Sequence, residues 1–215
     1  MALPTRDPAG LRALVEDRLR GSSPGGDPFA ALARERTAEE IEMLRTMLPA
    51  TFSRAAVLVP IVEQPGGLTV LLTERASHLK HHAGQISFPG GRIEPSDRGP
   101  WEAALRETEE EIGLPRGHVT HAGWLGDHIV VSGYVVTPAV GFVRPGYELS
   151  LDRTEVQSVF EVPLAYALDA ANYVARERTF AGRTFRGHDL PYEGRNIWGA
   201  TAVMLGSLRR ALGLP

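Results

Sequence analysis

The sequence of 215 residues contains no cysteine, no long apolar run and no strong excess of charge of either sign. Without cysteine the chain forms no disulfide, uses no thiolate in catalysis and does not bind zinc through sulfur. This composition is typical of a reducing compartment, and we expect a cytoplasmic protein. No stretch approaches the roughly 18 apolar residues that a membrane span needs. The charges spread through the N-terminal segment are unlike a secretory signal.

The charge balance excludes further classes of partner. The formal net charge is -3, from 23 Lys and Arg against 26 Asp and Glu, so we expect neither nucleic acid nor a membrane as a partner. The hydrophobic content of 43% is ordinary for a globular chain that buries a sizeable core.

Hydrophobic periodicity and turn signals divide the chain into two parts. A helical arm is predicted over residues 1–50, packed on or beside a domain that spans residues 51–215. Within the arm, the periodicity predicts helices over residues 8–20 and 38–47, the second with Thr37 as its N-cap.

Strands dominate the predicted domain. They are expected over residues 55–63 and 68–74, which form a hairpin across a QPGG turn, and over 85–91, 118–130, 134–143 and 156–163. These strands are followed by a short helix over 164–170 and a hairpin over 172–190 centred on Ala181–Gly182. The last element is a helix over 197–212, with Trp198, Ala202, Leu205 and Leu208 at core spacing. A mixed sheet with few helices predicts an α+β or α/β sandwich.

A helix rich in glutamate is predicted between Pro100 and Gly113, because proline suits a first turn and glycine ends a helix. At about 100° per residue, Glu107, Glu110 and Glu111 fall within one quadrant that borders the core face. Such like charges repel, and more strongly where solvent is scarce. A solvated acidic surface is the simple alternative, but a hard divalent cation with oxygen ligands would remove the conflict.

A glycine pair lies shortly before this helix. Gly90 and Gly91 have no β-carbon, so their backbone can approach a ligand closely or present a carbonyl to a metal. Alone, the pair is also consistent with an ordinary turn. Together with the acidic helix it predicts a site where metal and phosphate meet.

Residues 106–114, RETEEEIGL, resemble the second half of the Nudix hydrolase signature, R-E-U-x-E-E-x-G-U, in which U is aliphatic. Only Thr108 departs from it. In the first half Asp97 stands where the signature has glutamate, and the gap to Arg106 is one residue longer. The resemblance implies a Nudix-type α/β/α sandwich with a mixed β-sheet.

Residues 71–91, LLTERASHLKHHAGQISFPGG, are similar to a second motif, that of the coenzyme A pyrophosphatase branch of this family. Lys80 replaces an arginine of the motif, which keeps the charge but loses the bidentate fork. The resemblance extends from about Arg54 to about Leu212. It implies cleavage of the pyrophosphate of coenzyme A, or of a coenzyme A derivative, with Mg²⁺ or Mn²⁺ as cofactor; coenzyme A itself would give adenosine 3′,5′-bisphosphate and 4′-phosphopantetheine. The expected partner is therefore this small-molecule substrate, bound by a monomer or a homodimer.

The resemblance also implies roles for residues of the acidic helix. Glu107, Glu110 and Glu111 are the expected metal ligands, with the carbonyl of Gly91 as a further contact. Arg106, placed on the exposed side of the helix, is expected to orient them.

The partner of Arg106 is a loop carboxylate, Asp97 or Glu94, or else a surface glutamate, Glu102 or Glu110.

The general base stays open between a helix glutamate and a later acid, Glu155 or Glu161, of which we prefer Glu155. Plain surface charge is the alternative for both. Expected substrate contacts are Arg75, Lys80, His82, Phe88 and Gly90, although Phe88 also suits a core position.

A zinc site formed by the histidines at 78, 81 and 82 is disfavoured, because no further ligand is evident. Two other functions are consistent with the motifs. One is a Nudix enzyme acting on ADP-ribose or NADH, and the other is an inactive Nudix domain that binds a ligand.

Overall fold

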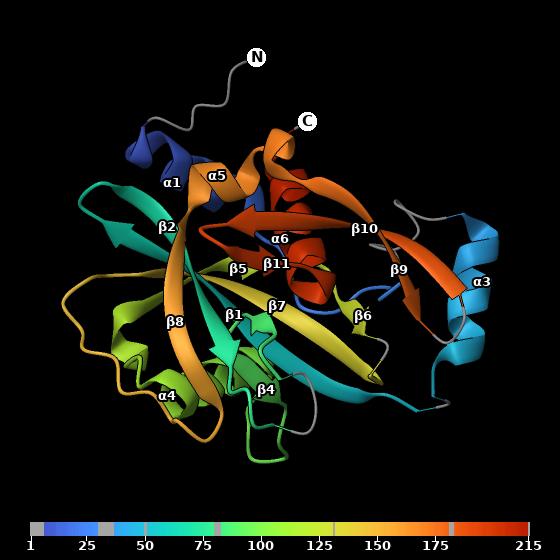
Figure 1. The fold of residues 1–215 in the computed structure, drawn as a ribbon. Coiled ribbons are helices and arrows are strands. Elements are labelled where there is room, and N and C mark those ends of the chain that lie inside the picture. Colours follow the sequence, from blue (N-terminus) through green and yellow to red (C-terminus); the bar gives the residue numbers. More distant parts are fainter. Residues whose placement is uncertain are drawn as a thin grey trace.

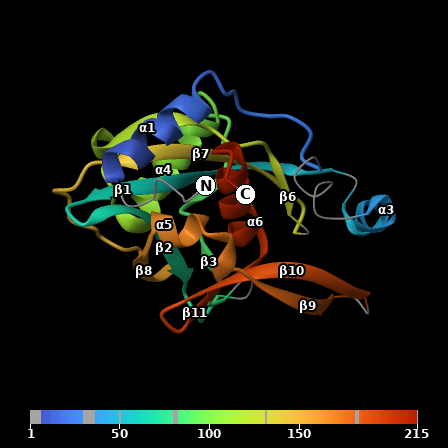
Figure 2. The same cartoon turned by 90° about the horizontal axis from the view of Figure 1, so that it is seen from above.

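The computed structural model describes residues 7–29, 37–49, 51–79, 83–130, 132–180 and 183–214. A mixed sheet lies between two helical layers (Figures 1 and 2), with α4 (Pro100–Ile112) on one face. The other face is covered by α1 (Pro8–Leu19), α5 (Leu164–Leu168) and α6 (Gly199–Ala211). This is the predicted α/β/α sandwich.

The centre of the sheet is β1 (Ser53–Gln64), which pairs antiparallel with β2 (Gly67–Arg75) and parallel with β7 (Tyr134–Val143). Both faces of β1 are buried, which explains its nearly continuous apolar sequence. Alternate residues belong to two separate cores: Ala55, Val59 and Ile61 face α1 and α6, whereas Ala56, Leu58 and Val62 face α4.

Shorter strands extend the sheet on both sides. On the β7 side lie β5 (Val119–Trp124) and β6 (His128–Val130), both antiparallel to β7. On the β2 side lie β8 (Val156–Pro163) and β3 (Ile86–Ser87), both antiparallel to β2. The strand predicted over residues 118–130 is therefore two strands. Single-turn helices η1 (Arg116–His118) and η2 (Ala170–Asn172) complete the connections.

The glycine pair lies within a strand of its own. We predicted a strand that ends at the glycines, but Gly90 and Gly91 belong to β4 (Gly90–Arg92), which pairs with β1. A β-carbon on Gly90 would lie 2.4 Å from the carbonyl oxygen of Ala56. Only glycine allows this approach, which the sequence pattern alone does not reveal.

Both N-terminal helices form where predicted. Helix α1 buries Leu11, Val15 and Leu19 in the core opposite α4, so it packs on the domain. Helix α3 (Ala38–Met47) has the expected Thr37 cap and lies at the edge of the molecule in both views. No helix in the described ranges is both long and apolar enough to cross a membrane.

The last strands form a separate antiparallel sheet of β9 (Val174–Phe180), β10 (Arg183–Tyr192) and β11 (Arg195–Ile197). The predicted hairpin is confirmed, although its centre at residues 181–182 lies outside the described residues. Strand β11 was not predicted. Because it occupies the start of the expected helix, Trp198 precedes α6 and is 36% exposed, so its predicted place in the core is wrong.

Candidate active site

Helix α4 carries the predicted acidic residues and ends as expected, with Gly113 in the left-handed conformation at φ 69°. A β-carbon on Gly113 would also lie 2.7 Å from the backbone nitrogen of Ser150. Thr108, which replaces an aliphatic residue of the signature, is buried and donates a hydrogen bond to the carbonyl of Ala104 at 2.6 Å. The threonine therefore fits the apolar position because its hydroxyl is satisfied within the helix.

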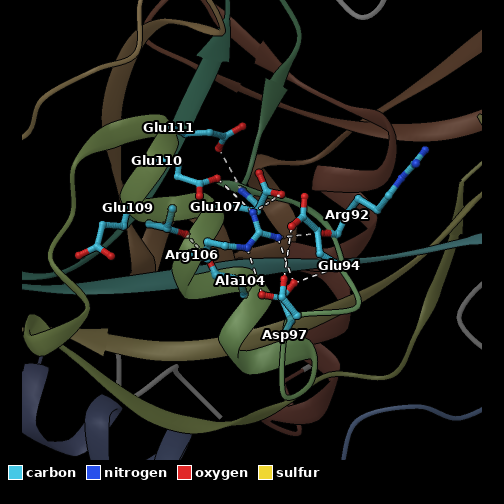
Figure 3. A network of polar contacts seen from close by, with 12 residues as sticks. Arg92, Glu94, Asp97, Ala104, Arg106, Glu107, Glu109, Glu110 and Glu111 are labelled. Carbon is cyan, nitrogen blue, oxygen red and sulfur yellow. Dashed lines mark hydrogen bonds and ion pairs between the residues drawn. The ribbon is translucent and has the colours of Figure 1, made fainter.

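Arg106 connects the helix to the loop before it (Figure 3). Its Nε and Nη2 donate to the two carboxylate oxygens of Asp97 at 3.1 and 3.0 Å. Nη1 donates to Glu107 at 3.0 Å and to Glu110 at 3.1 Å, and Nη2 also donates to the carbonyl of Arg92 at 3.0 Å. Both kinds of partner that the sequence left open are therefore present, a loop carboxylate in Asp97 and a surface glutamate in Glu110.

The surroundings of Arg106 differ from the sequence-based expectation. Its side chain is only 19% exposed, because residues 92–97 fold over it, so the predicted exposed position is wrong. The pKa of the Asp97 carboxyl is lowered, chiefly by its hydrogen bonds from Arg106. The same bonds raise the pKa of Arg106, so the guanidinium stays charged. Arg106 is thus a fixed cation between acids of the loop and of the helix.

Glu111 is the buried acid of the cluster, with 6% of the residue exposed. Its Oε2 accepts a hydrogen bond from the Gly90 N–H at 3.1 Å, and Arg75 Nη1 lies 3.9 Å from its Oε1. Burial nevertheless raises the pKa of Glu111 to about 7, because these two contacts only partly offset the loss of water. The Glu111 carboxylate therefore lacks enough neighbouring positive charge to offset its burial.

Glu107 lies against the other glycine of the pair. A β-carbon on Gly91 would be 2.4 Å from the Glu107 carboxyl carbon and 2.5 Å from its Oε2. Burial raises the pKa of Glu107, in part against the hydrogen bond from Arg106. Two carboxylates that are costly to ionise therefore border the Gly90–Gly91 backbone.

Glu110 is the exposed acid of the cluster, because its side chain is 60% exposed, and it shares the Nη1 of Arg106 with Glu107. Within the described ranges, no three Asp, Glu, His or Cys side chains converge closely enough to hold an ion as they stand. The donors are nevertheless oxygen atoms, and the pKa values of Glu107 and Glu111 are those of acids that a cation would stabilise. Their chemistry fits a hard divalent ion near Gly91.

A loop between β7 and β8 docks on the end of α4. The backbone N–H of Ser150 donates to the carbonyl of Ile112 at 3.0 Å, and that of Asp152 donates to the carbonyl of Glu111 at 2.9 Å. The Asp152 carboxylate then accepts hydrogen bonds from the N–H and hydroxyl of Thr154 at 2.8 and 2.7 Å. We did not predict this contact, although an Asp two residues before a Thr is a known turn signal.

The docked loop delivers Glu155 to the acidic cluster. Its N–H donates to the carbonyl of Asp152 at 3.0 Å, and its carbonyl accepts from the N–H of Ala76 at 2.8 Å. The charge of Glu155 contributes to the raised pKa values of both Glu107 and Glu111, so the three carboxylates share one environment. Glu155 is therefore brought to the candidate site from a distant part of the sequence.

Glu161, the other late acid, lies elsewhere. It pairs in register with Leu71, well before the end of β2 that carries Arg75. Its carboxylate accepts hydrogen bonds from the Gln64 amide at 2.9 and 3.0 Å and from the Thr69 hydroxyl. Glu161 thus links three strands, and a structural role accounts for it.

The remaining predicted residues occupy different environments. Arg75 and Gly90 both contact Glu111, as described above. Phe88 is 3% exposed and packs in the core, the alternative that the sequence left open. Lys80 and His82 lie outside the described residues.

The profile of the NUDIX domain matches residues 52–181. The uncharacterized Nudix hydrolase NudL of Escherichia coli O7:K1 (strain IAI39) is 42% identical over 163 residues, covering 75% of this chain and 83% of that protein. NudL of Shigella flexneri serotype 5b (strain 8401) is 37% identical over 191 residues, covering 86% of this chain and 98% of that protein.

Among solved structures, the binary complex of a C. elegans Ap4A hydrolase covers 51% of this chain and 80% of its own, with 22% identity and a TM-score of 0.45. The family assignment depends on the domain profile, which spans more than half of the chain, and on the NudL relatives. The protein belongs to the Nudix hydrolase family.

Proposed function

We propose that this Nudix hydrolase cleaves the pyrophosphate of coenzyme A, with Mg²⁺ or Mn²⁺ as cofactor. One observation carries the proposal. The segment that resembles the coenzyme A motif, residues 71–91, meets the acidic helix at Glu111 through both Arg75 and Gly90. These contacts support a single site to which both the motif segment and the acids contribute.

The charges of the site suit a diphosphate substrate. A bound divalent ion neutralises the phosphate oxygens and makes a bound water more acidic. Glu107, Glu110 and Glu111, with the Gly91 carbonyl, are the residues that would hold it. Arg75 lies beside Glu111 and supplies a guanidinium for a phosphate oxygen.

Two further residues serve the reaction without holding the substrate. Arg106 fixes Glu107 and Glu110 relative to the preceding loop, so the acids keep their orientation. Glu155 acts as the general base that accepts a proton from the attacking water. The water oxygen bonds to phosphorus as the bridging P–O bond breaks, and the bridging oxygen leaves with the other product.

Incubation of the protein with coenzyme A and Mg²⁺ or Mn²⁺ tests the proposal. Chromatography should show adenosine 3′,5′-bisphosphate and 4′-phosphopantetheine in equal amounts, and Glu111→Gln should reduce their formation at least about 100-fold. Glu161→Gln is the matched control, because that acid is tied to Gln64 away from the acidic cluster.

Other outcomes would contradict the proposal in different ways. Faster hydrolysis of ADP-ribose or NADH than of coenzyme A would assign another substrate to the same site. Tight binding of coenzyme A without turnover in either metal would indicate an inactive ligand-binding domain.

A further inference from the structure

The small C-terminal sheet exposes two large apolar residues on one face. Trp198 continues β11 in extended conformation beyond the Leu190–Ile197 pair, which places it beside Asp189, and Asp189 pairs with Val174 on β9. Trp198 is 36% exposed and Val174 is 40% exposed, whereas Asp189 between them is 2% exposed. The two exposed side chains give this face an apolar surface against which an aromatic ring can pack.

The indole is supported from one side. Arg178 donates from Nη1 and Nη2 to both oxygens of Asp189 at 2.6 Å, and its guanidinium carbon lies 4.6 Å from the centroid of the Trp198 ring. Asn196 donates to the same carboxylate at 2.7 Å. Arg178 is therefore neutralised and held, and it fixes the orientation of the indole.

A second arginine on this face is not neutralised in the same way. Arg176 lies two residues before Arg178, hence on the same face, and it is exposed. The described residues contain no ion pair to Arg176, and Asp189 nearby is already bound by Arg178. Gly187 of β10, which pairs with Arg176, leaves open space beside it, since a β-carbon on Gly187 would meet nothing within 4 Å. Arg176 therefore lies about 7 Å along β9 from Val174, the residue that pairs with Asp189 beside Trp198.

The small sheet that carries this face is anchored to β3, the strand that leads to the glycine pair. The hydroxyl of Thr201, at the start of α6, donates to the carbonyl of Ile86 in β3 at 2.8 Å. Strand β11 lies beside β3, as Figure 2 shows, and the guanidinium of Arg195 lies 4.5 Å from the centroid of the Phe160 ring on β8. The small sheet is therefore fixed next to the segment that we assign to substrate recognition.

We infer that this face, which comprises Trp198 and Arg176 supported by Arg178, Asp189 and Asn196, binds the adenosine 3′-phosphate end of the substrate. Adenine stacks on the open side of the indole, and Arg176 pairs with the 3′-phosphate. The inference rests on the proposed function, because it takes coenzyme A as the ligand. It assigns substrate recognition to the C-terminal sheet as well as to the motif before the acidic helix.

Steady-state kinetics on coenzyme A and on 3′-dephospho-coenzyme A test the inference. Trp198→Ala should raise KM about tenfold for both substrates, with kcat nearly unchanged. Arg176→Ala should raise KM about fivefold for coenzyme A only, since the second substrate lacks the phosphate. Arg186→Ala is the matched control, an exposed arginine on the opposite face of the same hairpin.

Calorimetry with adenosine 3′,5′-bisphosphate gives a readout that is independent of turnover. Its affinity should fall about tenfold in Trp198→Ala, and in Trp198→Phe it should stay within about threefold of wild type, because phenylalanine retains a stacking surface. If wild type does not hydrolyse coenzyme A, the proposed function fails, while this binding measurement still decides the inference.

Unchanged KM and unchanged bisphosphate affinity in both alanine variants would overturn the inference. A dimer in sedimentation velocity that dissociates in Trp198→Ala with KM unaltered would likewise overturn it, by showing that the face is a contact between two copies. Far-ultraviolet circular dichroism of each variant must match wild type, and Arg176→Ala, an exposed change, provides a test even if Trp198→Ala fails to fold.

Discussion

At the scale of single residues, the acidic helix depends on one guanidinium. Arg106 bonds to three carboxylates and a carbonyl, while the Asp97 side chain beneath it is 3% exposed. Removal of the arginine would leave the buried Asp97 carboxylate with the Glu94 N–H but no cation, and such a loss costs more than the intact pair contributes.

We therefore expect Arg106→Ala to lower the free energy of unfolding by about 3 kcal/mol in urea denaturation. Arg98→Ala is the control, because Arg98 also pairs with a glutamate of this helix but is 90% exposed. Its effect should be too small to distinguish from wild type in the same measurement. Equal losses in the two variants would show that Arg106 is an ordinary surface partner.

The raised pKa of Glu111 predicts how the free energy of unfolding depends on pH. Its pKa is about 7 in the folded protein against an ordinary 4.5, so the folded state binds the proton more tightly than the unfolded state. The free energy of unfolding must then fall as pH rises from about 4.5 to about 7, by about 3 kcal/mol from this group.

Glu111→Gln removes this dependence. In EDTA, the stability of the variant relative to wild type should increase between pH 4.5 and pH 8, as measured by urea unfolding at both values. His128, whose pKa burial lowers to about 4, acts in the opposite direction but equally in both proteins, so it cancels in the difference. A difference that is constant with pH would contradict the assignment of a raised pKa to Glu111.

At the scale of elements, the two glycines of β4 are required for different reasons. A β-carbon on Gly90, which has φ 145°, would strike the backbone of β1, which cannot move aside. A β-carbon on Gly91 would strike the carboxyl end of Glu107, a side chain that can rotate away. A side chain at Gly90 would therefore disturb the sheet, whereas a side chain at Gly91 would disturb only the candidate site.

We expect Gly90→Ala to lower the free energy of unfolding by about 3 kcal/mol, through strain and overpacking. Gly91→Ala should cost less than about 1 kcal/mol in EDTA but weaken Mn²⁺ binding at least about tenfold, because Glu107 is displaced. Thermal unfolding and calorimetric titration with Mn²⁺ measure the two effects. Normal Mn²⁺ affinity in Gly91→Ala would exclude Glu107 from the metal site.

At the scale of the whole molecule, the N-terminal helix α1 closes the core opposite the acidic helix. Leu11 and Val15 are 2% and 0% exposed and belong to the same cluster as Ile61 of β1 and Leu205 of α6. The α1 helix lies outside the region that matches the NUDIX domain, residues 52–181, yet it covers the sheet.

Leu11→Ala should therefore lower the free energy of unfolding of the whole domain by about 3 kcal/mol. A single cooperative transition by circular dichroism and by tryptophan fluorescence should persist, with the same shift by both probes. Leu14→Ala, at a half-buried position of the same helix, should cost clearly less. A separate early transition would show that α1 unfolds independently of the sheet.

The amino-acid sequence by itself determined the local features of this protein. The capping box at Thr37, the β1–β2 hairpin and the ends of α4 at Pro100 and Gly113 follow from contacts within a few residues, and they form where expected. The two motifs likewise identified the helix and the glycine pair on which the proposed site depends.

Tertiary structure alone decided which residues meet. The docking of the 144–155 loop on α4 brings the charge of Glu155 within electrostatic range of Glu107, and the loop before the helix buries Arg106. The exposure of Trp198 depends on an unforeseen strand. Each outcome results from pairing between segments distant in sequence, whose register and burial no local periodicity encodes.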